Sequence, residues 1–362
     1  MRRESGKVIS DKVAANVNEQ EFSVTVQTKL MQNYRVGSII QGGANMCSTS
    51  CIGEAGYEDA LFVTDSRGEI YCLKQDSGST TGMVGEKIGM HGNHVALGRD
   101  SNGKLIIFSS QAEQLYCMQE KKKGSFTFNS SENVAIPLPV NASSIEAICV
   151  KQIKEGMSIA VFYKTQLDAA YYVAYGIWKD QAPEFRLLPS TFGNTACIWL
   201  GSQEEDLALA VVDNIVATYH LASKKIETYS CDTILRPIAI KNVIGQAGED
   251  IIFAIIKNGK NADLSELKLN QDKKNCEVIP LSKDKYFTSF DICKVQEGEI
   301  HLLGIATDNV LYHAVKQIDE SQTTSDLTPI SSGIAQVSCC GSYAKELTAF
   351  IVGTTQNRVA HF

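Results

Sequence analysis

Several features that mark particular classes of protein are missing from this sequence of 362 residues. It contains no run of about 20 apolar residues, so no membrane span is expected. Basic residues are not in excess, because 34 of them face 41 acidic ones and leave a formal net charge of −7. General nucleic-acid binders need a basic surface to displace phosphate counterions, so no nucleic-acid partner is expected.

The sequence also lacks the common motifs of catalysis and metal binding. It has no GxGxxG, GxxxxGK[ST] or GxSxG motif, no sialidase Asp-box, and no CxxC pair among its 11 cysteines. We therefore expect no cofactor, no metal and no enzymatic activity. A glycoside-active enzyme stays open as an alternative, because acidic residues cluster at 204–206, 249–250 and 297–299.

The cysteines and the N-terminus indicate a cellular compartment. Cys72, Cys117 and Cys149 lie in apolar, strand-like runs, as small buried thiols do. The first 20 residues begin with basic residues but lack the apolar core of a secretory signal. The sequence predicts a cytoplasmic protein, with a secreted mature chain as the alternative.

Short β-rich runs are what the sequence has in abundance. They are four to eight residues long, rich in Val, Ile, Phe and Tyr, and bounded by Gly, Asn, Asp or Ser. One of them recurs as IYCLKQD, LYCMQEK, AYGIWKD, TYHLASK, ELKLNQD, LYHAVKQ and VAHF, at intervals of 44 to 59 residues. Its anchor positions are Tyr71, Tyr116, Tyr175, Tyr219, Leu267, Tyr312 and Ala360. This period is typical of four-stranded propeller blades.

The repeat predicts an all-β fold, a seven-bladed β-propeller of four-stranded antiparallel blades that forms one domain over residues 1–362. An outer strand can be assigned to six units, for example TGMVGEKIG and KIETYSC, but the seventh lacks one. We expect residues 21–30 to supply it, with residues 1–20 as an N-terminal extension. Such closure removes exposed sheet edges. A pair of β-sandwiches or a β-helix is disfavoured by the regular spacing.

Three units resemble those of the fucose-binding and tectonin-like propeller lectins. The segment 94–120, HVALGRDSNGKLIIFSSQAEQLYCMQE, carries the resemblance, and residues 60–76 and 305–317 fit the same frame. The resemblance implies sugar sites between neighbouring blades, built on Trp, Arg and acidic side chains. Only Trp178 and Trp199 are present, so we expect one or two pockets near the third and fourth units rather than a full ring.

Two binding functions follow from these observations. The first is a non-catalytic carbohydrate-binding lectin whose ligand-binding residues are Trp178, Trp199, Tyr175 and Asp213. The alternative is a protein-interaction scaffold within a larger assembly, whose acidic surface favours basic partners. The expected partner is thus a glycan or a protein, held on one propeller face or between blades.

Two sets of recurring polar residues have a structural interpretation. His220, His313 and His361 each follow an anchor position, and packing is favoured over a shared metal site because equivalent positions lie on different blades. The turn acids Asp65, Asp213 and Asp308 are predicted to accept a hydrogen bond from their own backbone two residues on, with a ligand role as the alternative.

Overall fold

A computed structural model describes most of the chain from residue 34 onwards. The described residues are 34–35, 46–50, 57–64, 67–76, 83–153, 156–167, 170–179, 182–188, 197–200, 207–212, 214–220, 223–232, 234–245, 250–282, 284–296, 299–318, 324–341, 347–353 and 358–361. They hold one short 3-10 turn, η1 (Ser130–Glu132), and otherwise almost only strands. No helix in this part of the chain has the length and apolar character needed to cross a membrane.

The first three groups of strands are separate four-stranded sheets of antiparallel strands. They consist of β2 (Met46–Ser50), β3 (Tyr57–Thr64), β4 (Glu69–Asp76) and β5 (Met83–His91); β6 (His94–Arg99), β7 (Leu105–Gln111), β8 (Gln114–Gln119) and β9 (Val134–Ile136); and β10 (Ala142–Ile153), β11 (Gly156–Thr165), β12 (Tyr171–Trp178) and β13 (Arg186–Leu187).

An eight-stranded sheet and two further four-stranded sheets follow. The eight-stranded sheet contains β14 (Cys197–Leu200), β15 (Leu207–Val212), β16 (Ile215–His220), β17 (Lys225–Cys231), β18 (Pro237–Ile244), β19 (Asp250–Asn258), β20 (Asn261–Asn270) and β21 (Asn275–Pro280). The last two sheets contain β22 (Phe287–Gln296), β23 (Glu299–Ala306), β24 (Leu311–Gln317) and β25 (Thr328–Ser331); and β26 (Ile334–Gly341), β27 (Leu347–Gly353), β28 (Arg358–His361) and β1 (Tyr34–Arg35).

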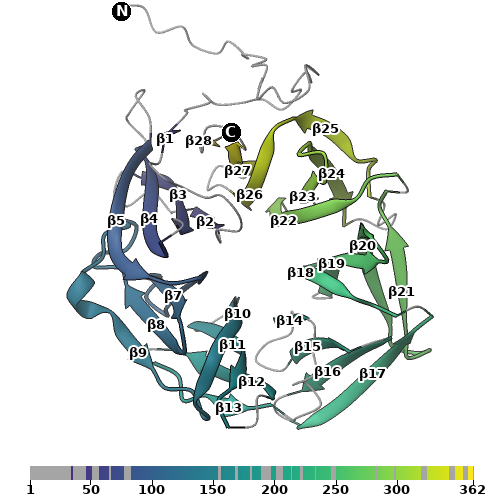
Figure 1. Ribbon diagram of the computed structural model, residues 1–362, viewed down its shortest axis with the longest axis horizontal. Helices are drawn as coiled ribbons and strands as arrows, with labels where there is room; N and C mark the ends of the chain where they lie inside the picture. The colour runs from purple at the N-terminus through teal and green to yellow at the C-terminus, as the bar shows by residue number, and fades with distance from the viewer. Residues whose placement is uncertain are drawn as a thin grey trace, which may run out of the picture.

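These sheets stand around a common centre and form a β-propeller, as predicted (Figure 1). The strands β2, β6, β10, β14, β18, β22 and β26 lie nearest the centre, and each contacts the next until β26 meets β2 again. Every predicted anchor lies on a third strand, namely β4, β8, β12, β16, β20, β24 or β28. The recurring sequence unit therefore corresponds to a recurring structural unit.

The predicted count of seven separate four-stranded blades is not supported by the strand pairing. Five separate four-stranded sheets are present, and the remaining eight strands form one sheet in the order β14-β15-β16-β17-β21-β20-β19-β18. The merger has a local cause, because the outer strands β17 and β21 pair in parallel through Ser230 with Asn275 and Cys231 with Cys276.

An N-terminal strand completes the C-terminal sheet. β1 pairs antiparallel with β28, Tyr34 opposite Val359 and Arg35 opposite Arg358, so the first described strand lies beside the last. The predicted closing strand at residues 21–30 and the extension at residues 1–20 lie outside the described residues. Closure of the ring by N-terminal residues is thus seen, whereas its predicted location at 21–30 stays a prediction.

Burial on both faces explains why many of these strands are almost wholly apolar. Every residue from Gly156 to Tyr163 in β11 is buried. Because successive side chains alternate between faces, Val161 packs into the apolar cluster that reaches Phe108 of β7, while Phe162 packs toward Ala217 of β16. The sheet β10–β13 is therefore covered by a neighbouring sheet on each face. The continuous apolar pattern of β11 indicates the same arrangement.

Aspartates in the described turns accept hydrogen bonds from the backbone two residues further on. Asp308 accepts a hydrogen bond from the main-chain nitrogen of Val310 at 3.2 Å, and Asp100 accepts one from that of Asn102 at 2.9 Å. These are local bonds to the backbone two residues on, which confirms the prediction for Asp308. Asp65 and Asp213 lie outside the described residues.

Candidate functional site

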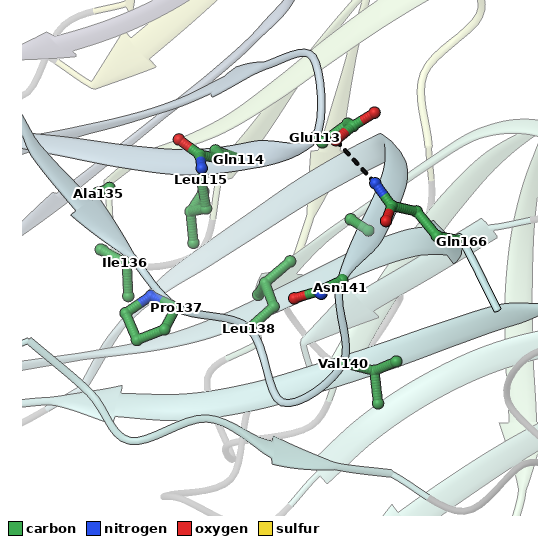
Figure 2. Close-up of a pocket in the computed structure, with 11 residues that line it drawn as sticks. Glu113, Gln114, Leu115, Ala135, Ile136, Pro137, Leu138, Val140, Asn141 and Gln166 are labelled. Atoms are coloured by element: carbon green, nitrogen blue, oxygen red, sulfur yellow. Dashed lines mark hydrogen bonds between the residues drawn. The ribbon is translucent and has the colours of Figure 1, made fainter.

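An open pocket lies between the second and third sheets (Figure 2). It is bounded by the start of β8, by β9 and the loop that follows it, by the start of β10 and by the turn after β11. Its volume of about 480 Å³ falls within the range of pockets that bind small molecules. The lining residues are Glu113, Gln114, Leu115, Ala135, Ile136, Pro137, Leu138, Val140, Asn141, Ala142 and Gln166.

The floor of the pocket is part of the apolar core between the two sheets. Leu115, Ile136 and Ala142 are buried there and belong to the same cluster as Phe108 and Trp178. Pro137 directly follows β9, where its missing N–H cannot continue the strand pairing, so the chain leaves the sheet at this point. The floor is therefore preformed by packing and does not depend on a ligand.

Polar side chains cross the mouth of the pocket from one sheet to the other. The side-chain nitrogen of Gln166 donates to Oε2 of Glu113 at 2.8 Å, as Figure 2 shows. The main-chain nitrogen of Gln166 donates to the carbonyl oxygen of Asn141 at 3.2 Å. Glu113 stands in the tight turn between β7 and β8, where the preceding Ala112 has a φ of 51°. The turn thus holds a carboxylate at the edge of the neighbouring sheet.

The chemistry of the lining suits an uncharged, hydroxyl-rich molecule. Gln114, Asn141 and Gln166 offer amide donors and acceptors, and Glu113 is the one ionisable residue among the described residues that line the pocket. The lining residues that the structure describes include no Lys, Arg or His to neutralise an anionic ligand. Among the described lining residues Glu113 is the single carboxylate, whereas glycoside hydrolysis uses two, about 5 to 9 Å apart.

Trp178 and Tyr175 were both predicted to bind the ligand, and the structure places them on opposite faces of one sheet. Trp178 is 7% exposed and lies edge-on to Phe108, with ring centroids 5.7 Å apart. Tyr175 is equally buried, packs toward Ala217, and donates its hydroxyl hydrogen to Oγ of Ser158 at 3.1 Å. Neither residue lines the pocket at Glu113.

The other two predicted ligand-binding residues cannot be placed in the same way. The backbone of Trp199 belongs to β14 and pairs with Leu209, but its side chain is outside the described part of the structure. Asp213 also lies outside the described residues. A ligand-binding role for Trp178, Trp199, Tyr175 and Asp213 stays a prediction.

The histidine that follows the anchor Tyr312 packs against a second histidine. His313 stacks on His301 with ring centroids 5.1 Å apart and an interplanar angle of 13°, and Nε2 of His313 lies 2.9 Å from Nδ1 of His301. Burial, and then the neighbouring His301, lowers the pKa of His313 to about 4. This contact confirms the predicted packing role for His313. His220 is half-buried, and the side chain of His361 lies outside the described residues.

Only part of the acidic clusters noted in the sequence belongs to the described residues, and Glu299 does not line the pocket. Residues 204–206, 249 and 297 lie outside the described residues. Glu299 lies at the start of β23, where it accepts a hydrogen bond from the side chain of Gln317 at 3.2 Å. Within the described part of the chain, no three His, Cys, Asp or Glu residues are grouped closely enough to hold a metal ion.

The sequence interpretation did not identify the residues that line the pocket. It placed the site near the third and fourth units on the strength of two tryptophans, whereas the pocket uses loops of the second and third. Two local signals were available: QAEQ marks a tight turn ahead of LYCMQ, and Pro137 and Pro139 mark the end of β9. Their convergence depends on the angle between neighbouring sheets, which no local pattern reveals.

Sequence comparison found neither a matching family model nor a matching curated protein. Comparison with solved structures found similar propellers at low identity. The structure of U3-55K matches with a TM-score of 0.53 and 10% identity, over 91% of this chain and 97% of the other. This likeness concerns the fold alone.

Two fungal lectins are also similar. A mutant of the Aleuria aurantia lectin in complex with Fucα1-6GlcNAc has a TM-score of 0.48 and 10% identity, over 80% of this chain and 96% of that one. AofleA from Arthrobotrys oligospora has a TM-score of 0.46 and 10% identity, over 94% of this chain and 88% of that one. What the comparisons establish is the fold: this chain is similar in architecture to known β-propellers.

Proposed function

We propose that this chain is a non-catalytic carbohydrate-binding propeller that holds a neutral sugar in the pocket between its second and third sheets. The observation that carries the proposal is the pocket at Glu113, with a polar mouth and an apolar floor. Amide and carboxylate groups can bond sugar hydroxyls, while Ile136 and Leu138 can cover the apolar C–H face of the ring. The lectin resemblance of residues 94–120, which contribute Glu113, supports the same assignment.

The binding test uses a broad glycan array, followed by calorimetry with the best neutral glycan. We expect Glu113→Gln to weaken binding at least tenfold, because a hydrogen bond to a charged group contributes about 1.5–3 kcal/mol. Glu277→Gln is the matched control, since Glu277 is also exposed but lies on β21, away from the pocket. The absence of binding to any neutral glycan at high protein concentration, or equal binding by both variants, would refute the proposal.

The proposal includes seven structural units around the ring. Each half of the eight-stranded sheet repeats the order of the separate sheets, from an inner strand to an outer one, and seven inner strands contact one another in a closed cycle. Within the described part of the chain, the strand pairing between the halves is limited to two residue pairs. We therefore regard β14–β17 and β18–β21 as two blades whose outer strands touch. An experimental structure in which these halves share inner-strand pairing would contradict this division.

A second candidate function is a scaffold that binds a protein partner. Leu167, next to Gln166 at the pocket mouth, is 86% exposed, and Ile234 and Ile238 are 60% and 53% exposed. Exposed apolar side chains contribute to protein interfaces when they are contiguous. If this function holds, Leu167→Ser and Ile234→Ser should each abolish recovery of a stoichiometric partner from native lysate, while Glu113→Gln should not.

A further inference from the structure

The contact between β17 and β21 joins two units through their outermost strands. The parallel pairing places Ser230 beside Asn275 and Cys231 beside Cys276, and the main-chain nitrogen of Ser230 donates to the carbonyl oxygen of Lys274 at 3.0 Å. The two strands are separated in the chain by β18, β19 and β20. A bond across this contact would therefore close a loop that contains most of one unit.

Side chains on β17 and in the turn that leads into β21 hold this contact in register. Nζ of Lys274 lies 2.8 Å from Oε2 of Glu227 and 5.1 Å from the centre of the Tyr229 ring. The hydroxyl of Tyr229 donates to Oε1 of Gln271 at 2.7 Å. Hydrogen bonds from Lys274 and then from Lys225 lower the pKa of Glu227 to about 2. The Glu227 carboxylate therefore stays ionised at neutral pH. These contacts all cross or flank the junction, and they fix how the strands meet.

Cys231 and Cys276 lie next to each other at this junction as free thiols. Each is 4% exposed, and both belong to the apolar cluster that also contains Tyr229 and Leu267. The thiol of Cys276 donates to the carbonyl oxygen of Glu277 at 3.9 Å. The interaction between the two thiols lowers the pKa of Cys231 and raises that of Cys276. The strand pairing thus places the two cysteines side by side in the reduced protein.

The backbone geometry is compatible with a covalent bond between the two thiols. Neighbouring strands lie about 4.7–4.9 Å apart, and disulfides span Cα separations of about 4.4–6.8 Å. Paired residues in a sheet also direct their side chains to the same face. The pairing of Cys231 with Cys276 therefore places their Cα atoms at a separation that a disulfide can span.

We propose that Cys231 and Cys276 form a redox-active dithiol whose oxidation to a disulfide locks the fourth and fifth units together. With hydrogen peroxide as the oxidant, the Cys231 thiolate attacks one oxygen, forms a sulfenic acid and releases water. The thiol of Cys276 then attacks the sulfenic sulfur, and the second oxygen leaves as water. Two thiols and one peroxide give one disulfide and two waters, so the balance is complete.

Oxidation should stabilise the folded chain by restricting its unfolded state. The disulfide closes a loop around the 44 intervening residues. A loop of this length in a chain of this size corresponds to a rise in Tm of about 5 °C. The low exposure of both thiols slows the reaction, so a small oxidant is required.

The test oxidises the full-length chain with hydrogen peroxide, alkylates the remaining thiols and maps tryptic peptides. The expected product is a cross-link between peptides 226–241 and 275–283, each of which contains one cysteine. Tm should rise by about 5 °C and return to its starting value on treatment with dithiothreitol. The peptide map of the unaltered chain keeps the test valid even if a cysteine variant folds poorly.

Two variants separate this dithiol from the other cysteines. Cys276→Ala should lose both the cross-link and the rise in Tm, whereas Cys117→Ala should keep both. Cys117 is a suitable control because it is buried elsewhere and desolvation raises the pKa of its thiol to about 11. The proposal would be overturned if the folded chain, after oxidation, lacked the cross-link between peptides 226–241 and 275–283. It would also be overturned if oxidation raised the Tm of Cys276→Ala as much as that of the unaltered chain.

Discussion

Two junctions between neighbouring sheets differ in where their polar side chains lie: at the surface in one and in the interior in the other. Between β6–β9 and β10–β13, Glu113 and Gln166 meet at the mouth of an open pocket, above an apolar core. Between β18–β21 and β22–β25, Lys316 and Glu266 are themselves in the interior, only 2% and 7% exposed, with Nζ 3.0 Å from Oε2. A polar pair at the rim leaves space for a ligand, whereas a buried pair fills that space and couples the sheets.

A second ion pair joins the same two sheets closer to the centre of the ring. Nζ of Lys241 on β18 lies 2.5 Å from Oδ1 of Asp291 on β22. Both pairs span the junction, so this region depends on charge complementarity as well as on apolar packing. The pocket junction depends on apolar packing, with its charge left at the surface. This contrast predicts different responses to substitution and to pH.

The largest effect should come from removing one charge of the buried pair. Lys316→Met leaves the Glu266 carboxylate buried without its cation, and we expect a loss of about 4 kcal/mol in the free energy of unfolding. The double variant Lys316→Met with Glu266→Leu should recover most of that loss, because no charge is then buried. Urea denaturation measures both.

An exposed lysine provides the control for this comparison. Lys122 is exposed in the loop after β8. Lys122→Met should change the free energy of unfolding by less than about 0.5 kcal/mol. If Lys316→Met cost no more than Lys122→Met, the buried pair would not be what couples these sheets.

Truncation of the pocket floor should be less costly than the same truncation at the sealed junction. Leu115→Ala should cost about 2–3 kcal/mol, because the space it opens joins the pocket and can admit water. Leu302→Ala, equally buried on β23, leaves a closed cavity and should cost about 3–4 kcal/mol. Equal losses of unfolding free energy in urea would contradict the distinction between an open and a sealed junction.

The stacked histidines should make the sheet β22–β25 sensitive to acid. An unfolded histidine titrates near 6.5, whereas burial and the neighbouring His301 lower the pKa of His313 to about 4. The folded state therefore favours the neutral ring, and this contribution is complete above about pH 6.5 and is lost as the pH falls toward 4. The loss should amount to about 2–3 kcal/mol.

This effect is measured as the change in the free energy of unfolding between pH 7 and pH 4, in the unaltered chain and in His313→Leu. His313→Leu should show a shallower decline than the unaltered chain, since it has no ring to protonate. Identical pH profiles would mean that the stacked pair does not control acid stability.

Among the junction contacts, the smallest effect on stability should come from the rim of the pocket. Gln166→Ala removes an exposed hydrogen bond to Glu113 and should cost about 0.5–1 kcal/mol. Thermal unfolding would detect this change. A loss above about 2 kcal/mol would show that the rim couples the two sheets in the manner of the buried ion pair.

Local repetition made the fold predictable. The anchors Tyr71, Tyr116 and Tyr312 mark equivalent third strands because each such strand must present the same apolar pattern to two neighbouring sheets. The outer strands could be recognised for the same reason, as KIETYSC shows by matching β17. Such signals lie within a few residues of one another and need no knowledge of distant contacts.

The candidate site could not be predicted in this way. Trp178 carried the strongest sequence signal for a ligand, yet it lies in the core against Phe108, because an apolar strand position is occupied equally well by a packing residue. Glu113 and Gln166 carried no signal of their own. They lie 53 residues apart and meet only because neighbouring sheets converge at that end of the ring.

The sequence by itself determined the all-β propeller and the position of its repeating strands, because apolar alternation and turn residues act locally. Only the tertiary structure decided which ends of the sheets stay open, which polar pairs are buried, and where outer strands touch. The contact between Cys231 and Cys276 belongs to this second kind. It depends on the relative angle of two units, and that angle is set by packing between sheets rather than by any residue within one strand.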